Sequence, residues 1–216
     1  MALSNILVTG ATGFVGKALI NELVAKKFSI SALVRNDSCL LFDEVKKISV
    51  DDLTVLRDYS EIMHNIEVVV HVAGRAHIMN EVVANPLAEF RRMNTNVTLH
   101  LARQAVGAGV KRFIFLSSVK VNGEITQVGQ SFKPDDGYIP IDPYGLSKYE
   151  AEQGLLAIAK ATGMEVVIIR SPLVYGVDVK ANFASMIKWV NSGVPLPLGA
   201  VHTKRSLIAL DNLVSF

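Results

Sequence analysis

Tyr144 and Lys148 lie four residues apart in the segment 142–148, directly after Pro143. Because proline favours the first turn of a helix, this spacing predicts that both side chains project from one helix face. An ammonium beside a phenol favours the phenolate, so we expect Lys148 to lower the pKa of Tyr144 from its usual value of about 10. Such a tyrosine can exchange a proton with a substrate hydroxyl. The alternative for so short a motif is a solvated helix face.

A glycine-rich turn follows the first apolar run of the chain. The run 3–8 predicts a strand, the segment 9–16 reads Thr-Gly-Ala-Thr-Gly-Phe-Val-Gly, and an amphipathic stretch continues to Lys26. The glycines permit a tight turn and let a pyrophosphate approach backbone N–H groups at a helix N-terminus. Their spacing is Gly-x-x-Gly-x-x-Gly rather than the commonest dehydrogenase pattern. The position between a strand and a helix favours nucleotide binding over an ordinary turn.

Composition excludes several other classes of protein. A chain of 216 residues, half of them hydrophobic, can bury a full core. The net charge of +2 gives no basic field for nucleic acid. The single cysteine, Cys39, excludes an internal disulfide and is typical of a reducing cytoplasm. There is neither a long apolar run nor a signal-peptide pattern, and the histidines have no metal-ligand spacing. We therefore expect a cytoplasmic protein with no metal, membrane or nucleic-acid partner.

Apolar runs alternate with helical patterns along the whole chain. The apolar, β-branched runs fall at 3–9, 28–34, 46–50, 66–72, 110–117 and 164–170, and the helical patterns near 14–26, 57–64, 86–108, 144–162 and 182–192. Strands separated by helices pair in parallel through right-handed crossovers. This pattern predicts an α/β fold, a Rossmann-like doubly wound sheet with helices on both faces. Its ligand should lie at the carboxyl ends of the strands, where Gly10, Ala73 and Ser118 fall.

Together these segments resemble the extended short-chain dehydrogenase/reductase family, in its NAD-dependent epimerase/dehydratase branch. The resemblance runs from residue 3 to the last residue. Its landmarks, in the order in which the family carries them, are the turn 9–16, Val50-Asp51-Asp52-Leu53, His71-Val72-Ala73-Gly74, Asn94, Phe115-Leu116-Ser117-Ser118 with Gly123, Tyr144 with Lys148, and the segment 170–176. This branch contains nucleotide-sugar 4-epimerases and 4-ketoreductases.

The resemblance implies three catalytic residues and an NAD(P) site. Ser118, Tyr144 and Lys148 match the catalytic set, with Ser118 chosen over Ser117 because it lies five residues before Gly123. The implied cofactor contacts are Gly10, Thr12, Gly13, Phe14, Val15, Gly16, Arg35, Asp52, Leu53, Val72, Ala73, Gly74, Tyr144 and Lys148. Asp52 matches the residue that accepts a hydrogen bond from the adenine amino group.

The end of the second predicted strand slightly favours NADP over NAD. An acidic residue there would bind the ribose hydroxyls of NAD, but this chain has Val34, followed by Arg35. A guanidinium can bind a 2′-phosphate with two hydrogen bonds. Alternatively, Arg35 stacks on adenine, which is compatible with either cofactor.

The resemblance also implies substrate contacts at Ser118, Asn182 and Arg205. Asn182 and Arg205 match residues that meet the substrate diphosphate, although Asn182 could instead be a helix N-cap. The segment 195–199 resembles the strand beside the uracil. Where 4,6-dehydratases carry two acids, this chain has Val119 and Lys120, so we do not expect dehydratase activity. Lys120 is either a solvated loop lysine or a contact for a substrate anion.

The resemblance implies hydride transfer at C4 of a nucleoside-diphosphate hexose, most simply a UDP-linked one. Two outcomes stay open: 4-epimerisation, or reduction of a UDP-N-acetyl-6-deoxyhexosulose by a 4-ketoreductase of polysaccharide synthesis. A third alternative, of another class, is an NAD(P)-binding regulatory or non-catalytic module. We expect a cofactor domain over residues 1–172 and a partial sugar-nucleotide subdomain over 173–216, because members of this branch usually continue further. The resemblance allows a homodimer.

Overall fold

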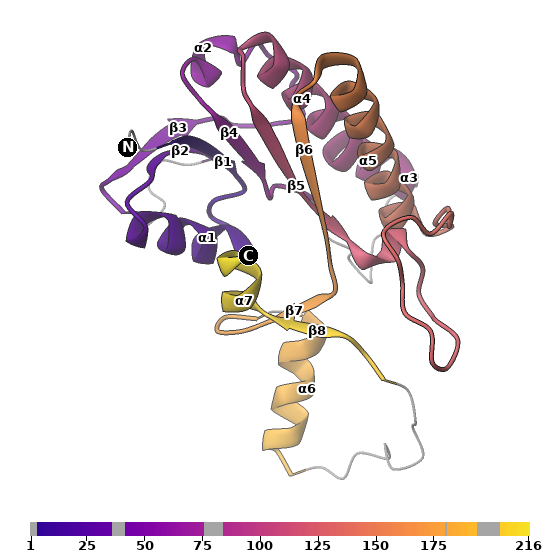
Figure 1. The fold of residues 1–216 in the computed structure, drawn as a ribbon. Helices are drawn as coiled ribbons and strands as arrows, with labels where there is room; N and C mark the ends of the chain where they lie inside the picture. Colours follow the sequence, from indigo (N-terminus) through magenta and orange to yellow (C-terminus); the bar gives the residue numbers. More distant parts are fainter. Residues whose placement is uncertain (1–3, 36–41, 76–83, 180, 194–203) are drawn as a thin grey trace.

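The computed structural model describes residues 4–35, 42–75, 84–179, 181–193 and 204–216, and a six-stranded sheet lies at its centre (Figure 1). The strands of this sheet are β1 (Asn5–Thr9), β2 (Ser29–Val34), β3 (Val45–Ser49), β4 (Val68–His71), β5 (Arg112–Ser118) and β6 (Glu165–Ser171). All neighbouring pairs are parallel, in the order β3-β2-β1-β4-β5-β6. The predicted Rossmann-like doubly wound sheet is therefore confirmed. The direction of winding reverses between β1 and β4, the usual place for a ligand.

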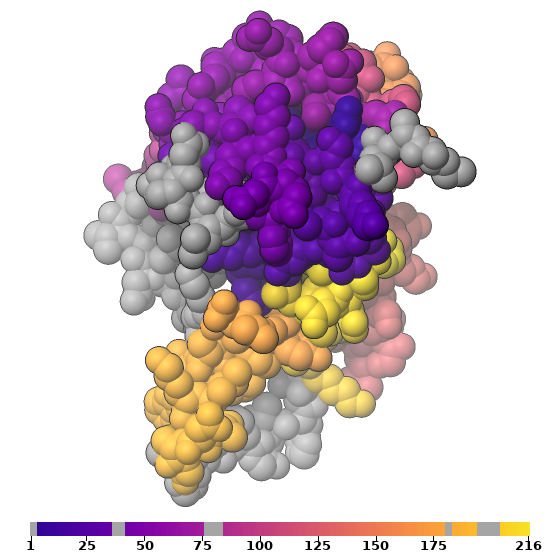
Figure 2. Space-filling view, turned by 90° about the vertical axis from the view of Figure 1, so that its left-hand side faces the viewer, coloured from indigo at the N-terminus to yellow at the C-terminus, as the bar shows by residue number. Residues whose placement is uncertain are grey.

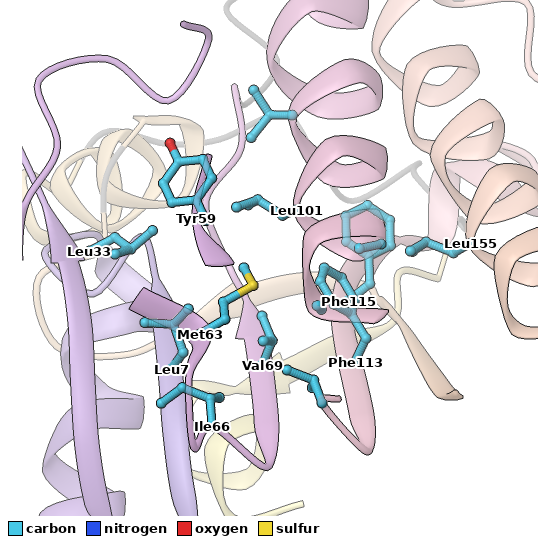
Figure 3. Packing of buried hydrophobic residues seen from close by; sticks show 14 of the residues in the cluster. Leu7, Leu33, Tyr59, Met63, Ile66, Val69, Leu101, Phe113, Phe115 and Leu155 are labelled. Carbon is cyan, nitrogen blue, oxygen red and sulfur yellow. The ribbon is translucent and has the colours of Figure 1, made fainter. Parts of the chain in front are cut away.

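Helices cover both faces of the sheet because side chains along each strand alternate between the faces. On one face lie α2 (Ser60–Met63), α3 (Pro86–Phe90), η1 (Arg91–Asn96), α4 (Val97–Gly107) and α5 (Pro143–Thr162); α1 (Phe14–Ala25) and α7 (Leu210–Ser215) lie on the other (Figure 1). Leu7, Phe113 and Phe115 pack with Leu101 of α4 and Leu155 of α5 in the larger core cluster (Figure 3). On the opposite face of the sheet, the residues of β1 and β2 that point the other way pack against α1 in a second core cluster.

A second, smaller sheet lies below the first in Figure 1. It consists of β7 (Leu173–Tyr175) and β8 (Leu207–Ala209), which pair in parallel, and it is accompanied by α6 (Ala181–Asn191). Figure 2 shows α6, in orange, projecting away from the main body, whereas α7, in yellow, packs against the indigo surface to which α1 belongs. The sequence predicts α6 but neither β7 nor β8, because three residues are too few to show an alternating pattern.

The helix that carries Tyr144 begins and ends as its sequence predicts. Asp142 is the N-cap of α5 and accepts a hydrogen bond from the N–H of Gly145 at 3.0 Å, and Pro143 occupies the first helical position. Gly163 ends the helix in the left-handed conformation with φ of 78°. Within the described part of the chain, no helix combines the length and the apolar character needed to cross a membrane.

Candidate functional site

The glycine turn between β1 and α1 has no room for side chains at two of its positions. Gly10 has φ of +73°, and a Cβ added there would lie 2.6 Å from the backbone nitrogen of Ala73. A Cβ on Gly16 would lie 2.0 Å from the carbonyl oxygen of Gly10. Gly13 is the N-cap of α1 and has no side chain to occupy the first N–H groups of the helix. The turn is therefore a close-packed cradle that presents a helix N-terminus to an anion.

A buried histidine joins β1 to β4 beside this turn. His71 contacts Thr9 Oγ1 through Nδ1 at 2.6 Å and Thr98 Oγ1 through Nε2 at 2.9 Å. Its ring stacks on Phe115 with centroids 5.8 Å apart. Burial, followed by the charge of Lys148, lowers the pKa of His71 to about 3, so the imidazole is neutral. His71 is a core residue that fixes the strand end from which Val72, Ala73 and Gly74 continue.

Ser118 and Tyr144 meet at the carboxyl edge of the sheet. Ser118 is the last residue of β5, and Tyr144 lies in the first turn of α5. The Ser118 side chain acts on the Tyr144 phenol and lowers its pKa. The Tyr144 ring also packs edge to face against Phe90, with centroids 5.8 Å apart. The structure therefore brings together two of the three residues to which the sequence assigned catalysis.

Lys148 lies one helical turn further along α5 and is almost fully buried. Its Nζ donates to the carbonyl oxygen of Leu116 at 3.0 Å and lies 4.5 Å from the centroid of the Phe115 ring. Burial lowers the pKa of Lys148 to about 8, although the nearby Glu152 carboxylate opposes this change. A Cβ added to Gly74 would lie 3.2 Å from the ammonium, so Gly74 and Lys148 belong to one site.

The expectation that Lys148 lowers the pKa of Tyr144 is wrong for this structure. Burial raises the pKa of Tyr144 above its usual value, whereas the hydrogen bond with Ser118 lowers it. Among the described residues, the charges that shift this pKa belong to Asp142, which raises it, and Lys120, which lowers it. The ammonium of Lys148 is instead directed to the Leu116 carbonyl. Helical spacing places two residues on one face but does not say which neighbour each one contacts.

Asn94 ties the segment after β4 to α5. It accepts a hydrogen bond from Arg75 N at 2.8 Å and donates through Nδ2 to the Arg75 carbonyl and to Ser147 Oγ, each at 3.1 Å. Ser147 in turn donates to the carbonyl oxygen of Tyr144 at 2.7 Å. The polar side chain of Asn94, fully buried in η1, thereby holds the segment after β4 against α5.

A second buried network, which the sequence did not predict, lies beneath the site. Glu152 is fully buried and accepts hydrogen bonds from Ser117 and from the guanidinium of Arg170. Arg170 lies opposite Ser117 in the β5–β6 pairing and also donates to Asn122 Oδ1 and to the Pro134 carbonyl. The available signal was the position of Glu152, four residues after Lys148 and on the same helix face.

The remaining predicted cofactor residues lie around the turn and at the ends of the neighbouring strands. Arg35 is exposed directly after β2, and Asp52 is exposed and accepts a hydrogen bond from Thr54 N at 2.8 Å. This hydrogen bond, with a smaller contribution from Arg35, lowers the pKa of Asp52. Leu53 packs against the larger core cluster. Around the turn, Gly16 is buried, and Thr12, Phe14 and Val15 are half-buried.

The predicted substrate residues are less closely grouped. Ser118 belongs to the cluster with Tyr144, whereas Arg205 is exposed and lies two residues before β8. Asn182 is the second residue of α6. It therefore lies within the helix, whereas an N-cap residue would lie before the first helical residue. The segment 195–199 lies outside the described residues. Where the structure describes the chain, no three His, Cys, Asp or Glu side chains could together hold a metal ion.

The parallel sheet, with a glycine-rich turn between its first strand and first helix, defines a Rossmann-like α/β protein. A family model described as the NAD dependent epimerase/dehydratase family matches residues 6–216. The chain belongs to this family.

Among relatives, a UDP-glucose 4-epimerase of Vibrio cholerae is 49% identical over 216 residues, covering 97% of this chain and 64% of that protein. Among solved structures, the UDP-glucose 4-epimerase of Thermotoga maritima with UDP-glucose has a TM-score of 0.82 at 25% identity, covering 98% of this chain and 71% of that one. MoeE5 in complex with UDP-glucuronic acid and NAD has a TM-score of 0.79 at 28% identity, covering 98% and 70%. The chain thus spans less than two thirds of the Vibrio cholerae relative.

Proposed function

We propose that this chain carries the cofactor site and catalytic centre of a nucleotide-sugar 4-epimerase that acts on a UDP-hexose. The observation that carries the proposal is the placement of Ser118, at the end of β5, beside Tyr144, in the first turn of α5, at the carboxyl edge of the sheet. The pair lies on the same edge of the sheet as the Gly10 cradle, where a dinucleotide binds. Similarity to the Vibrio cholerae epimerase and to structures that hold UDP-sugars supports the choice of substrate.

The residues of the cradle fit an NAD(P) cofactor. Because a Cβ at Gly10 or Gly16 would collide with backbone, the turn keeps the N-terminus of α1 open for a pyrophosphate. Gly74 leaves space above Lys148 on the nicotinamide side. When bound, NAD(P) supplies the acceptor and donor of the C4 hydride. MoeE5 holds NAD; the exposed Arg35 after the non-acidic Val34 supports NADP for this chain.

We assign the proton transfer to Tyr144. Its phenol would exchange a proton with the 4-oxygen of the sugar, and Ser118 would hold that oxygen in place by a hydrogen bond. Lys148 would position the nicotinamide ribose from below. Its pKa of about 8 leaves it largely protonated at neutral pH and able to release its proton in mildly basic solution.

One observation favours the second candidate, a 4-ketoreductase. Burial raises the pKa of Tyr144, so the phenol holds its proton at neutral pH. A protonated phenol is the form that reduction of a 4-keto sugar requires, because the new hydroxyl takes that proton. Epimerisation needs both forms in turn.

The other predictions from the sequence stand beside these proposals. The end of β6 at Ser171 and the start of β7 at Leu173 support a boundary between the segments 1–172 and 173–216. Light scattering would test the homodimer, and fractionation of cells would test the cytoplasmic location. The non-catalytic alternative predicts cofactor binding without turnover.

The deciding experiment is cofactor titration followed by assays with UDP-sugars. An epimerase interconverts UDP-glucose and UDP-galactose, or their N-acetylated forms, and leaves its cofactor unchanged. A reductase oxidises NAD(P)H in a one-to-one ratio with a 4-keto sugar. Tyr144→Phe should lower turnover by about 10²- to 10⁴-fold and leave cofactor affinity nearly unchanged. Tyr149→Phe is the matched control, because five residues along a helix turn its side chain toward another face. Full activity of Tyr144→Phe would overturn the assignment.

A further inference from the structure

A long loop joins the two segments that carry Ser118 and Tyr144. It runs over residues 123–141, from just after the short 3-10 turn η2 (Val119–Val121) to the N-cap of α5. In Figure 1 this loop, in pink, extends beyond the carboxyl ends of the strands, as β7, β8 and α6 also do. Loops of this length inside a compact domain are commonly functional. Both ends of the loop are set beside the candidate catalytic residues.

Asn122 and Arg170 hold the middle of this loop from beneath. Asn122, which is 7% exposed, donates through Nδ2 to the carbonyl oxygen of Lys133 at 2.6 Å. Arg170 donates through Nη1 to the carbonyl oxygen of Pro134 at 2.9 Å and to Asn122 Oδ1 at 3.2 Å. Two neighbouring carbonyl groups of the loop are thus bound by two side chains that also bind each other. We call these four residues the loop anchor.

The other nitrogens of Arg170 connect the loop anchor to the floor of the candidate site. Nε and Nη2 donate to the carboxylate of Glu152, which lies one helical turn after Lys148 in α5. The same carboxylate accepts a hydrogen bond from Ser117, the neighbour of Ser118 in β5. One guanidinium therefore joins the loop to the strand end and to the helix that present the candidate catalytic groups.

The loop is also folded upon itself around the anchor. Lys133 N donates to Asp136 Oδ2 at 2.7 Å, and Asp136 N donates to the Lys133 carbonyl at 3.3 Å. Gly123 has φ of +131°, and a Cβ added there would lie 3.3 Å from the ring of Phe132 and 3.8 Å from the ring of Tyr138. The anchor therefore sets the place of a folded unit.

We propose that the loop 123–141 is a wall of the sugar-binding site and that Asn122 and Arg170 are the positioning residues that hold this wall in place. The proposal rests on the proposed function, in which Ser118 and Tyr144 hold the 4-oxygen of the sugar. A loop that begins and ends beside these two residues borders the sugar. The glycine turn for the cofactor diphosphate follows β1, and β4 lies between β1 and β5. Loss of the anchor should therefore weaken binding of the sugar nucleotide and leave binding of the cofactor unchanged.

The test uses two variants of Asn122. Asn122→Asp keeps the size of the side chain and its acceptor toward Arg170, but an ionised carboxylate cannot donate to the Lys133 carbonyl. Asn122→Ala removes both contacts without adding a charge, and it takes over the test if the charge of the first variant prevents folding. Gln130→Ala, at an exposed position of the same loop, is the control.

Two measurements are made on each protein. Amide hydrogen exchange of the loop, followed by mass spectrometry, reports how firmly the loop is held. Steady-state kinetics with UDP-glucose, together with calorimetric titration of NAD and NADP, separates binding of the substrate from binding of the cofactor.

We expect faster exchange over residues 124–138 in both Asn122 variants, with exchange in β5 and α5 unchanged. The KM for UDP-glucose should rise about five- to tenfold, which is the worth of roughly one hydrogen bond. Both kcat and the affinity for the cofactor should stay as in the wild type, because the lost contact serves binding of the substrate alone. Gln130→Ala should match the wild type in every measurement.

Unchanged exchange in both Asn122 variants would overturn the loop anchor. Faster exchange with an unchanged KM would show that the anchor holds the loop but that the loop is no wall of the sugar site. A wild-type chain that turns over no UDP-sugar would overturn the proposed function, and the anchor would then stand or fall by the exchange of the loop.

Discussion

The guanidinium of Arg170 holds the carboxylate of Glu152 through two nitrogens, with Nε 3.0 Å and Nη2 2.7 Å from Oε2. Glu152 is fully buried and lies on the helix that also carries Tyr144 and Lys148. Through Ser117, the same carboxylate holds the strand end next to Ser118. The floor of the candidate site is therefore an ion pair that joins β5, β6 and α5.

Removing one partner of this ion pair should lower the free energy of unfolding far more than removing both partners. Glu152→Ala leaves the Arg170 guanidinium without its buried carboxylate, and we expect a loss of about 3–5 kcal/mol in the free energy of unfolding. The double variant Glu152→Leu with Arg170→Met should lose clearly less free energy of unfolding than Glu152→Ala, because neither charge is then left unpaired. Urea unfolding measures both. A double variant as unstable as the single one would contradict this account.

The glycine cradle gives a second prediction, which compares two alanine substitutions. One should weaken cofactor binding, and the other should stabilise the fold. Gly16→Ala places a Cβ 2.0 Å from the Gly10 carbonyl oxygen, so the turn must move and cofactor affinity should fall at least about tenfold, or about 1.4 kcal/mol. Gly107→Ala has nothing within 4 Å of the added Cβ at the end of α4 and should stabilise the protein by about 0.4–1 kcal/mol. Calorimetric titration with NAD and NADP, together with thermal unfolding, tests both. Undiminished affinity in Gly16→Ala would show that the cradle is not the cofactor site.

His71 predicts sensitivity to acid. Its pKa is about 3 in the folded protein and 6.5 without the surrounding fold, so between these values the unfolded chain binds a proton that the folded one does not. The free energy of unfolding should therefore fall as pH drops below 6.5, by up to about 1.4 kcal/mol per pH unit. His71→Gln should remove this part of the slope, and His64→Gln, at an exposed position, should not. Equal slopes for wild type and His71→Gln in urea unfolding between pH 4 and 7 would contradict the prediction.

The buried Lys148 leads to a prediction for stability at basic pH. Its pKa is about 8 when folded against 10.5 ordinarily, so between these values the unfolded chain again binds the extra proton. Wild-type stability should rise, relative to Lys148→Met, as the pH increases from about 8 toward 10.5, by up to about 1.4 kcal/mol per pH unit. Lys17→Met, on the exposed side of α1, is the control and should follow the wild type. Parallel curves for wild type and Lys148→Met would refute the depressed pKa.

Residue patterns predicted the helices and strands whose formation depends on the order of neighbouring residues in the sequence. The runs 28–34 and 110–117 became β2 and β5 because β-branched and apolar side chains suit a strand buried on both faces. The meeting of Ser118 with Tyr144 could be expected because a strand of a parallel sheet ends, and the helix that follows it begins, at the same edge of the sheet.

What the sequence could not supply depends on contacts between distant residues. The direction of the Lys148 ammonium toward Leu116, and hence the wrong expectation for Tyr144, follows from how deeply α5 packs on β5. The partner of Glu152 lies 18 residues away on another strand, and no helical periodicity points to it. The predicted helix 86–108 contains a π-helical segment, η1, which hydrophobic spacing does not reveal.

This π-helical segment fixes the length of the chain between Phe90 and Val97. A π turn holds one residue more than an α turn, so if the same residues formed a continuous α-helix, everything after the segment would lie about 100° further round the helix axis. Asn94 and Thr95 contact Ser147 from within the segment, and Leu101, which follows it in α4, packs in the larger core cluster. An uninterrupted helix of standard pitch would satisfy one of these two sets of contacts and lose the other. The extra residue therefore sets the rotational phase between the two parts of the helix, so that the segment meets Ser147 while α4 packs in the core.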